Sequence, residues 1–575
     1  MVKLLRFLKP FSKSVAAVLL LVFIQSLAEL YLPTLMADIV DTGIAFDDTP
    51  YILRIGALML LVAGVSAICL ILASFLSAKI ATGFGKNVRR KVFSQVESYS
   101  LHEFDQIGTA SLITRTTNDI TQVQQVLIMI MRMMISAPMM AIGGVIMAVS
   151  KDATLSLVLV VVIPLLAAAI ILIAGKGIPL FRTMQVKLDK LNLVLRENLT
   201  GIRVIRAFNR ISHEQKRFYD ANSDLTGTAI KVNKLMAAMM PIMMLVMNFT
   251  TIAIVWFGGI RVDHGDMQVG DMMAFIQYAM QIMFSLIMVS MMFVMIPRAQ
   301  ASAVRINEVL DTVPEIKDPA VAKRADSKRG FVEFKNVTFS YPGAEQSAIR
   351  DISFQASPGE ITAIIGGTGS GKSTLINLIP RFYDVDSGNI LVDGVDVREM
   401  SQENLRAKIG FVPQKAVLFH GTIAENIRFG NDGATDEEVK SAADTAQATE
   451  FIMDMKDGFQ SIIAQGGANL SGGQKQRLSI ARALVRRPEI YVFDDTFSAL
   501  DFKTDAKLRA ALKMETKDST VLIVAQRVST VMNADRIIVM DEGHIAGIGK
   551  HRELLKTCEV YREIVSSQLA EEEIA

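Results

Sequence analysis

A glycine-rich segment in the C-terminal half of the chain has the residue types and spacing that bind phosphate groups. It consists of Gly366, Gly367, Thr368, Gly369, Ser370, Gly371, Lys372, Ser373 and Thr374. The β-branched run 361–365 before it predicts a strand, and residues 374–382 after it predict a helix. In a strand–loop–helix context the glycine N–H groups converge on phosphates, Lys372 reaches the β- and γ-phosphates, and Ser373 binds Mg²⁺. We therefore predict that the chain binds a nucleoside triphosphate.

Two further segments supply groups for the same chemistry. Residues 490–494 predict a strand that ends in Asp494, a carboxylate suited to holding the Mg²⁺ of the nucleotide. The residues just before a predicted helix over 475–485 would bind a second anion through a serine, glycine amides and the helix dipole. They are Ser471, Gly472, Gly473 and Gln474. One chain thus carries two phosphate-binding surfaces, and two chains facing head to tail could each complete the other's site.

The first half of the chain is predicted to lie in a membrane. Hydrophobic residues make up 51% of the chain, and the excess is concentrated in six apolar runs. Each run exceeds the roughly 20 residues that a helix needs to cross the hydrocarbon core. The runs are 15–37, 55–78, 127–149, 153–174, 236–259 and 272–296. The lipid bilayer is therefore an expected partner of this half.

The distribution of basic residues predicts the orientation. The connections between the second and third runs and between the fourth and fifth are rich in Lys and Arg, whereas the opposite connections are short and poor in them. Because basic connections stay in the cytoplasm, we expect both termini and the nucleotide site there, in a multi-pass protein of the plasma membrane. The net charge of +2 gives no sign of a nucleic-acid partner, and two cysteines make no disulfide framework.

These elements predict an all-α six-helix transmembrane domain followed by an α/β P-loop nucleotide-binding domain. We place the membrane domain at 1–312, a linker rich in charge and proline at 313–329, and the nucleotide-binding domain at 330–575. Within the first run, Glu29 is a carboxylate near mid-helix. An intramembrane acid is costly, so Glu29 is a candidate substrate-binding residue, with a locally paired structural carboxylate as the alternative.

Taken together, these motifs resemble those of a half-size ABC exporter of the type IV fold, and the resemblance covers essentially all 575 residues. It implies that Tyr341 stacks on the adenine, that Gln414 lies near Mg²⁺, and that Asp501 ends the D-loop beginning at Ser498. It also implies that residues near 104–107 and 201–208 form the coupling helices that dock onto nucleotide-binding domains.

Two positions depart from the family pattern. Asp495 stands where most members have a catalytic Glu, and Gln526 stands where they have a switch His. Asp is shorter by one C–C bond, about 1.5 Å, and misplacement by about 1 Å can cost on the order of 100-fold in rate. Gln526 can donate a hydrogen bond to the γ-phosphate but cannot carry an imidazolium charge. The chain is therefore expected to bind ATP and Mg²⁺ and to hydrolyse ATP slowly.

The segment Ser471–Gln474 matches the family's signature motif and is intact, whereas the ATP site of this chain departs from the pattern at Asp495 and Gln526. This combination resembles the degenerate-site subunit of heterodimeric bacterial multidrug exporters. That resemblance implies a second half-exporter as partner and amphipathic small molecules as substrates. The alternatives are a homodimeric exporter of drugs or lipids with two slow Asp sites, and an ATP-gated channel or regulatory subunit that transports nothing.

Overall fold

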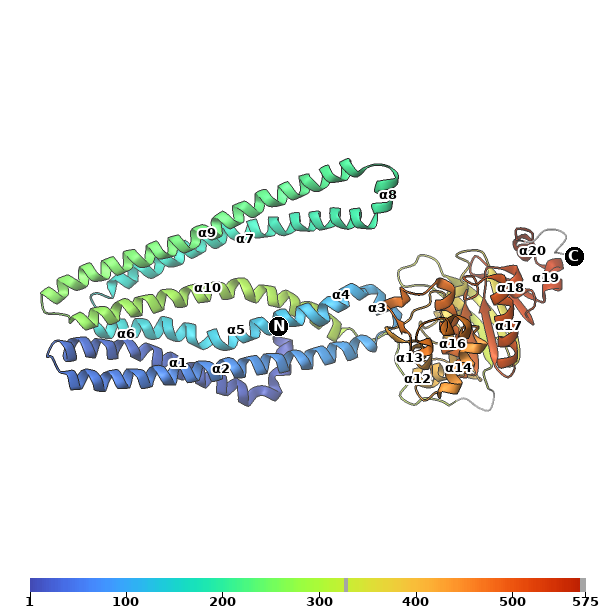
Figure 1. Ribbon diagram of the computed structural model, residues 1–575, viewed down its shortest axis with the longest axis horizontal. Coiled ribbons are helices and arrows are strands. Elements are labelled where there is room, and N and C mark those ends of the chain that lie inside the picture. Colours follow the sequence, from blue (N-terminus) through green and yellow to red (C-terminus); the bar gives the residue numbers. More distant parts are fainter. Residues whose placement is uncertain (325–328, 569–575) are drawn as a thin grey trace. The chain divides into compact units, whose positions relative to one another are not determined.

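The computed structural model describes residues 1–324 and 329–568, so part of the expected linker lies outside the described residues. The chain forms two compact units (Figure 1). The first comprises Met1–Glu97 and Thr109–Thr312, and the second comprises Ser98–Gly108 and Val313–Ala575. The second unit therefore includes a short segment, α3 (Leu101–Ile107), that interrupts the first unit in sequence.

The first unit is built from long helices. Within the described residues, six continuous helical stretches are long and apolar enough to cross a membrane: Lys3–Ile44, Thr49–Glu97, Thr109–Lys151, Leu157–Thr200, Ile211–Asp263 and Val269–Asp311. Helices suit a bilayer because every backbone N–H and C=O is satisfied within the segment. Large apolar side chains such as Leu172, Phe249 and Trp256 are exposed, as expected of a lipid-facing surface. The predicted six-helix membrane domain is confirmed.

The elements of the first unit, in chain order, are η1 (Val2–Phe11), α1 (Ser12–Asp38), η2 (Ile39–Ile44), α2 (Thr49–Glu97), α4 (Thr109–Thr114), η3 (Arg115–Asp119), α5 (Ile120–Pro138), η4 (Met139–Gly143), α6 (Gly144–Lys151), α7 (Leu157–Thr200), α8 (Ile202–Ala207), α9 (Ile211–Asp263) and α10 (Val269–Asp311). α7 and α9 form an antiparallel pair joined at its end by the short cross-piece α8 (Figure 1). α1, α2, α5 and α10 pack against one another.

The second unit contains a six-stranded sheet in the order β12-β11-β3-β10-β9-β6, parallel except for β12. A separate antiparallel sheet has the order β2-β1-β4-β5, and β7 pairs with β8. The strands are β1 (Val332–Phe339), β2 (Ile349–Ala356), β3 (Ile361–Gly366), β4 (Ser387–Val392), β5 (Val395–Asp396), β6 (Ile409–Val412), β7 (Gly421–Thr422), β8 (Ile462–Ile463), β9 (Ile490–Asp494), β10 (Thr520–Val524), β11 (Arg536–Asp541) and β12 (His544–Gly549).

Helices surround these sheets. They are α11 (Lys372–Asn377), α12 (Gln402–Ala407), α13 (Ile423–Arg428), α14 (Asp436–Thr445), α15 (Thr449–Met453), η5 (Gly458–Gln460), η6 (Gln465–Gly467), α16 (Gly472–Val485), α17 (Phe502–Glu515), α18 (Val528–Val531), α19 (His551–Thr557) and α20 (Glu559–Ser566). The α/β fold predicted for the C-terminal half is confirmed.

Three neighbouring strands position the candidate site. β3, β10 and β9 are parallel and adjacent, and their apolar centres are fully buried, as at Ile364, Leu522 and Val492. Buried parallel strands read as continuous apolar runs, which is why β3 and β9 could be predicted from sequence. Because parallel strands end at the same edge of a sheet, the residues that follow β3, β9 and β10 meet there.

Candidate nucleotide-binding site

The glycine-rich loop joins β3 to α11. Gly369 and Gly371 have φ angles of +84° and +93°, in the left-handed region that favours glycine. A Cβ on Gly371 would lie 2.7 Å from Cγ2 of Ile349, and one on Gly366 would lie 2.2 Å from the carbonyl oxygen of Met540. Glycine is therefore required at 369 for backbone conformation, at 366 for close packing, and at 371 for both.

The helix after the loop differs from the expected one. α11 begins at Lys372 rather than at residue 374 and ends at Asn377, well before residue 382. Gly371, in the left-handed conformation, is its N-cap, so Lys372 and Ser373 already belong to the first turn. The sequence-based boundary missed this because it started the helix after the polar residues of the loop.

Lys372 lies inside the loop and is 8% exposed. Its Nζ donates to the carbonyl oxygens of Gly366 and Gly367, at 3.0 and 2.5 Å, and to Oγ of Ser370 at 3.3 Å. Burial lowers the pKa of the Lys372 ammonium, and the nearby carboxylates of Asp495 and Asp494 offset part of that shift. The loop thus holds one cationic group at its centre, surrounded by backbone dipoles.

Oxygen-bearing side chains gather at the carboxyl edge of the sheet. Oγ of Ser373 donates to Oδ1 of Asp494 at 3.0 Å, which joins α11 to the end of β9. Burial raises the pKa of the Asp494 carboxyl, the Ser373 hydrogen bond opposes this, and the charge of Asp495 raises it further. Hydroxyl and carboxylate oxygens are the ligand types that Mg²⁺ prefers, so this pair fits the predicted metal site.

Asp495 is held by two carboxamides. Its Oδ2 accepts a hydrogen bond from Nε2 of Gln526 at 3.1 Å and a longer one from Nε2 of Gln414 at 3.4 Å. Its φ is +44°, in the left-handed region, where Asp is found several times more often than most residues. Burial raises the pKa of the Asp495 carboxyl, and hydrogen bonds from Gln414 and Ser498 oppose that shift. The structure therefore places Gln414, Asp495 and Gln526 together.

The second anion-binding segment lies at the start of α16. Ser471 is the N-cap: its Oγ accepts from the Gln474 backbone N–H at 3.3 Å, and Oε1 of Gln474 accepts from the Ser471 N–H at 2.8 Å. Among the described residues, no hydrogen bond or ion pair joins this segment to the glycine-rich loop, and both Ser471 and Gly472 are exposed. The segment is thus arranged to present N–H groups outward rather than to its own loop.

Two other predicted site residues, Tyr341 and Asp501, have defined contacts in the same unit. Tyr341 is partly exposed, packs edge-on against Phe339 and Tyr383, and shares a 3.0 Å hydrogen bond between its hydroxyl and Oγ1 of Thr374. Thr374 closes the glycine-rich segment, so this contact holds an aromatic ring beside the loop. Asp501 caps α17 by accepting from the Thr504 N–H at 3.0 Å, which lowers the pKa of its carboxyl.

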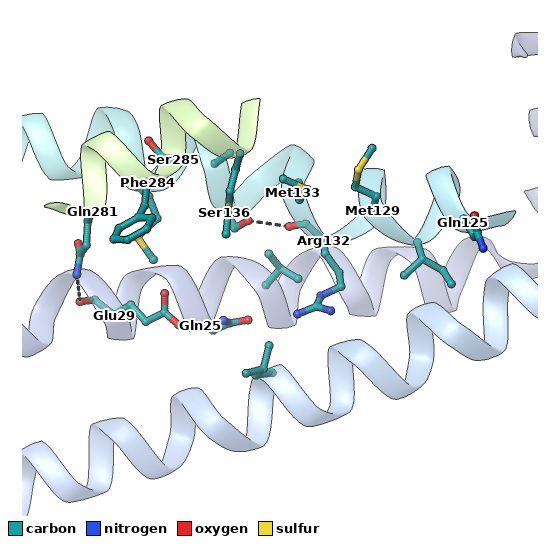
Figure 2. A pocket seen from close by; sticks show the side chains of 16 residues that line it. Gln25, Glu29, Gln125, Met129, Arg132, Met133, Ser136, Gln281, Phe284 and Ser285 are labelled. Carbon is teal, nitrogen blue, oxygen red and sulfur yellow. Dashed lines mark hydrogen bonds between the residues drawn. The ribbon is translucent and has the colours of Figure 1, made fainter. Parts of the chain in front are cut away.

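A cavity of about 680 Å³ lies within the membrane unit, between α1, α2, α5 and α10 (Figure 2). Glu29 lines it, and Oε1 of Glu29 accepts from Nε2 of Gln25 at 3.0 Å, so the local pairing considered as an alternative is present. The sequence analysis missed Arg132, which lines the same cavity. The available signal was a basic residue inside the apolar run 127–149, where ionisable side chains are rare.

Comparison with known proteins identifies the chain. Residues 15–286 match the family model for the ABC transporter transmembrane region, and residues 349–498 match the model for the ABC transporter domain. An uncharacterized ABC transporter ATP-binding protein of Mycobacterium tuberculosis is 44% identical over 98% of this chain and 97% of its own length. The chain belongs to the ABC exporters.

Further likenesses agree with a half-size ABC exporter, in which a membrane domain precedes one ABC domain. YgaD of Bacillus subtilis, whose name marks it provisionally as a multidrug export ATP-binding/permease protein, is 33% identical over 99% of both chains. The solved structure of a bacterial Atm1-family ABC exporter with ATP bound matches with a TM-score of 0.81 and 25% identity, covering 97% of this chain and 99% of that one. ATP binding and ATPase-coupled transport by a dimer follow from this membership.

In this ABC exporter the short segment α3 is tied to the nucleotide-binding unit. Glu103 is buried, and its Oε1 accepts from the Glu315 N–H at 2.8 Å, while its other oxygen accepts from the Ser100 N–H and hydroxyl. Burial raises the pKa of the Glu103 carboxyl, but these hydrogen bonds outweigh burial and leave that pKa below its ordinary value. The carboxylate thereby joins α3 to the start of the second unit.

We predict that Glu103→Gln weakens the coupling between transport and hydrolysis. Gln keeps one acceptor oxygen but replaces the other with an NH₂ group, which faces the donors at Ser100 and loses the charge-assisted bonds. Basal ATPase is expected to persist, whereas the stimulation of ATPase by substrate should fall several-fold. A loss of about 1–2 kcal/mol of hydrogen-bond free energy at Glu103 corresponds to a change of this size. ATPase assays of the purified transporter with and without substrate measure this, and unchanged stimulation would contradict the role of Glu103.

Proposed function

We propose that this chain is one subunit of a heterodimeric ABC exporter that moves amphipathic drugs or other hydrophobic compounds out of the cell. In this proposal residues 1–312 form the membrane domain and residues 330–575 bind ATP, with both termini in the cytoplasm at the plasma membrane. The name of the B. subtilis relative supports a multidrug substrate class. The observation that carries the proposal is the pair Asp495 and Gln526, joined by a 3.1 Å hydrogen bond, at the two positions where most members have a Glu and a His.

In this proposal each residue of the site has a role. Ser373 and Asp494, joined by a 3.0 Å hydrogen bond, would hold Mg²⁺ with Gln414 nearby. When bound, Mg²⁺ neutralises charge that develops on the phosphates. Lys372 would bind the β- and γ-phosphates, the loop N–H groups from Gly366 to Thr374 would surround them, and Tyr341 would stack on the adenine. Asp501 would contribute to the site from the D-loop.

We expect the hydrolysis step at this site to be slow. Asp495 would orient and deprotonate the attacking water, yet its side chain is one C–C bond, about 1.5 Å, shorter than Glu. Gln526 would donate to the γ-phosphate without adding positive charge to a transition state that is rich in negative charge. The outward-facing signature Ser471–Gln474 would instead complete the site of the partner subunit, where most hydrolysis would occur.

The test is to express the chain with and without a companion half-exporter and to assay ATPase and dye transport in proteoliposomes. We expect the chain alone to bind ATP but hydrolyse it slowly, and to recover robust hydrolysis with a companion that has Glu after its strand Asp. Vigorous transport by the chain alone, abolished by Asp495→Asn, would establish the homodimer instead. ATP binding with no directional dye movement in either preparation would establish a regulatory subunit or channel.

Within the heterodimer we predict unequal effects from matched substitutions. Asp495→Asn in this chain should change transport modestly, because its carboxylate contributes little to turnover. The equivalent Glu→Gln change in the companion should reduce transport by about 100-fold or more, the range typical for loss of a general base. Initial rates of dye transport in vesicles that carry both subunits measure the two effects, and equal losses would contradict an asymmetric pair of sites.

A further inference from the structure

The membrane cavity contains an arginine, Arg132, that forms no ion pair with an acid among the described residues. The guanidinium of Arg132 makes no hydrogen bond or ion pair with another residue among those the structure describes, although its backbone carbonyl accepts from the Ser136 hydroxyl at 2.9 Å. Figure 2 shows its side chain extending from α5 toward α1, with the guanidinium beside Gln25. A charge inside a membrane domain is costly, so an unpaired one facing a cavity indicates a function there.

The neighbouring wall of the cavity supplies hydrogen-bond acceptors. Glu29 offers a carboxylate whose partner is the neutral amide of Gln25. On α10, Nε2 of Gln281 donates to the Glu29 carbonyl at 3.2 Å (Figure 2), while its Oε1 is buried and receives no hydrogen bond within the described residues. This wall therefore suits a ligand group that donates hydrogen bonds, such as an ammonium or a hydroxyl.

In the proposed orientation, Arg132 lies about one helical turn closer to the cytoplasmic ends of the spans than Glu29 does. At about 1.5 Å per residue, it lies roughly 28 Å from Lys151 at the outer end of its span, whereas Glu29 lies roughly 22 Å from Ile44. Side chains on a helix lean toward its N-terminus, which for α5 is the cytoplasmic end. Arg132 thus lies on the cytoplasmic side of Glu29, and both side chains lie between the ends of their spans.

Much of the remaining lining of the cavity is apolar and flexible. Its lining includes Met129, Met133, Met140, Phe284 and Met288. Thioether side chains are flexible and polarizable, so they pack against varied hydrocarbon or aromatic groups. The cavity therefore combines one cationic side chain, one anionic side chain and an apolar surface of low shape specificity.

We propose that this cavity selects amphiphiles that carry an acidic group, a phosphate, sulfonate or carboxylate, bound by Arg132, together with a hydrogen-bond donor or ammonium bound by Glu29 and Gln281. This inference rests on the proposed exporter function and narrows its substrate class to zwitterionic amphiphiles. A purely cationic compound is disfavoured because Arg132 repels it, and a purely anionic one because Glu29 does. A zwitterion satisfies both charges.

The experiment measures equilibrium binding, without ATP, to the full chain in nanodiscs together with any subunit that co-purifies. The probes share one fluorescent tail and differ in headgroup: phosphoethanolamine, phosphate, trimethylammonium or an uncharged diol. A sulfonated zwitterionic dye without acyl chains tests whether the cavity binds zwitterions that are not lipids. Binding of both zwitterions identifies a general amphiphile site, and binding of the acylated one alone identifies a lipid site; either result supports the proposal.

Arg132→Gln is expected to weaken binding of the two phosphate probes and the sulfonated dye by roughly 10- to 100-fold, the loss expected for a charge-assisted contact. The same change should leave trimethylammonium binding unchanged or tighter, and Arg132→Lys should restore much of the phosphate binding. Glu29→Gln should weaken phosphoethanolamine and trimethylammonium binding while sparing the phosphate probe. Lys176→Gln removes a positive charge from α7 of the same unit, outside the cavity lining, and is the matched control.

Equal weakening of all headgroups by Arg132→Gln, or equal binding of all headgroups by the unaltered protein, would overturn the proposal. The outcome is separable from that of the exporter function. ATP-driven dye movement with no headgroup-specific effect of Arg132→Gln leaves the exporter intact and removes the inference. Headgroup-specific binding without ATP-driven movement supports the inference and removes the exporter function.

Discussion

Replacing Lys372 with alanine is expected to reduce ATP affinity by about 100-fold or more. The ammonium is buried at the centre of the glycine-rich loop, where it holds the Gly366 and Gly367 carbonyl oxygens at 3.0 and 2.5 Å. In the nucleotide complex the same group would make charge-assisted bonds to two phosphates, each worth about 1.5–3 kcal/mol. Titration of the purified protein with a fluorescent ATP analogue measures the loss.

Lys507→Ala is the matched control for this change, because Lys507 is an exposed lysine on α17 of the same unit. Its ATP affinity should equal that of the unaltered protein. Thermal unfolding of both variants without nucleotide separates lost binding from lost folding, since Lys372 also ties the loop together. Unchanged ATP affinity in a folded Lys372→Ala protein would show that the loop does not bind the triphosphate.

Lengthening the carboxylate at position 495 should accelerate hydrolysis at this site. Asp495→Glu adds about 1.5 Å of reach, and correcting a misplacement of this size can raise the rate by on the order of 10- to 100-fold. The gain should be measured as ATPase of the chain alone, or beside a companion whose own catalytic Glu is changed to Gln. Adding Gln526→His should increase it further by restoring a group that can become cationic.

The local backbone limits how large the gain from Asp495→Glu can be. Residue 495 has a φ of +44°, which Asp tolerates better than Glu. Asp495→Asn is the matched control, since it keeps length and shape and removes only the charge. ATPase that rises equally in the Glu and Asn variants would show that carboxylate length does not limit this site.

The parts of the site that could be predicted from sequence are those fixed by strand order. Asp494 and the glycine-rich loop each follow a buried apolar run, and parallel strands bring their ends to one edge, so their proximity follows from the pattern alone. The contact of Gln414 and Gln526 with Asp495 needed the family resemblance, because neither glutamine lies in a pattern that points to the other. The left-handed backbone at Asp495 had no signal in the sequence.

Other features escaped because local pattern does not determine them. The strand β1 continues through a register shift between Phe334 and Val337, which alternation of residue types does not reveal. Arg132 was not predicted as a site residue, because an apolar run indicates which residues enter the membrane but not which of them face a cavity. Within the described residues, Oε1 of Gln281 lacks a hydrogen bond because of how α10 packs against α1, and the sequence pattern does not specify this packing.

In the proposed dimer, the capping of α16 affects how the Ser471–Gln474 segment would release a nucleotide. The Ser471 oxygen accepts the Gln474 N–H, yet its own proton is not used by any hydrogen bond of the described residues. Turning that proton toward a phosphate therefore requires only rotation about the Cβ–Oγ bond, and the helix keeps its first turn throughout. Separation of two nucleotide-binding domains would then proceed as a rigid-body movement, with no refolding step to slow the exchange of ADP for ATP.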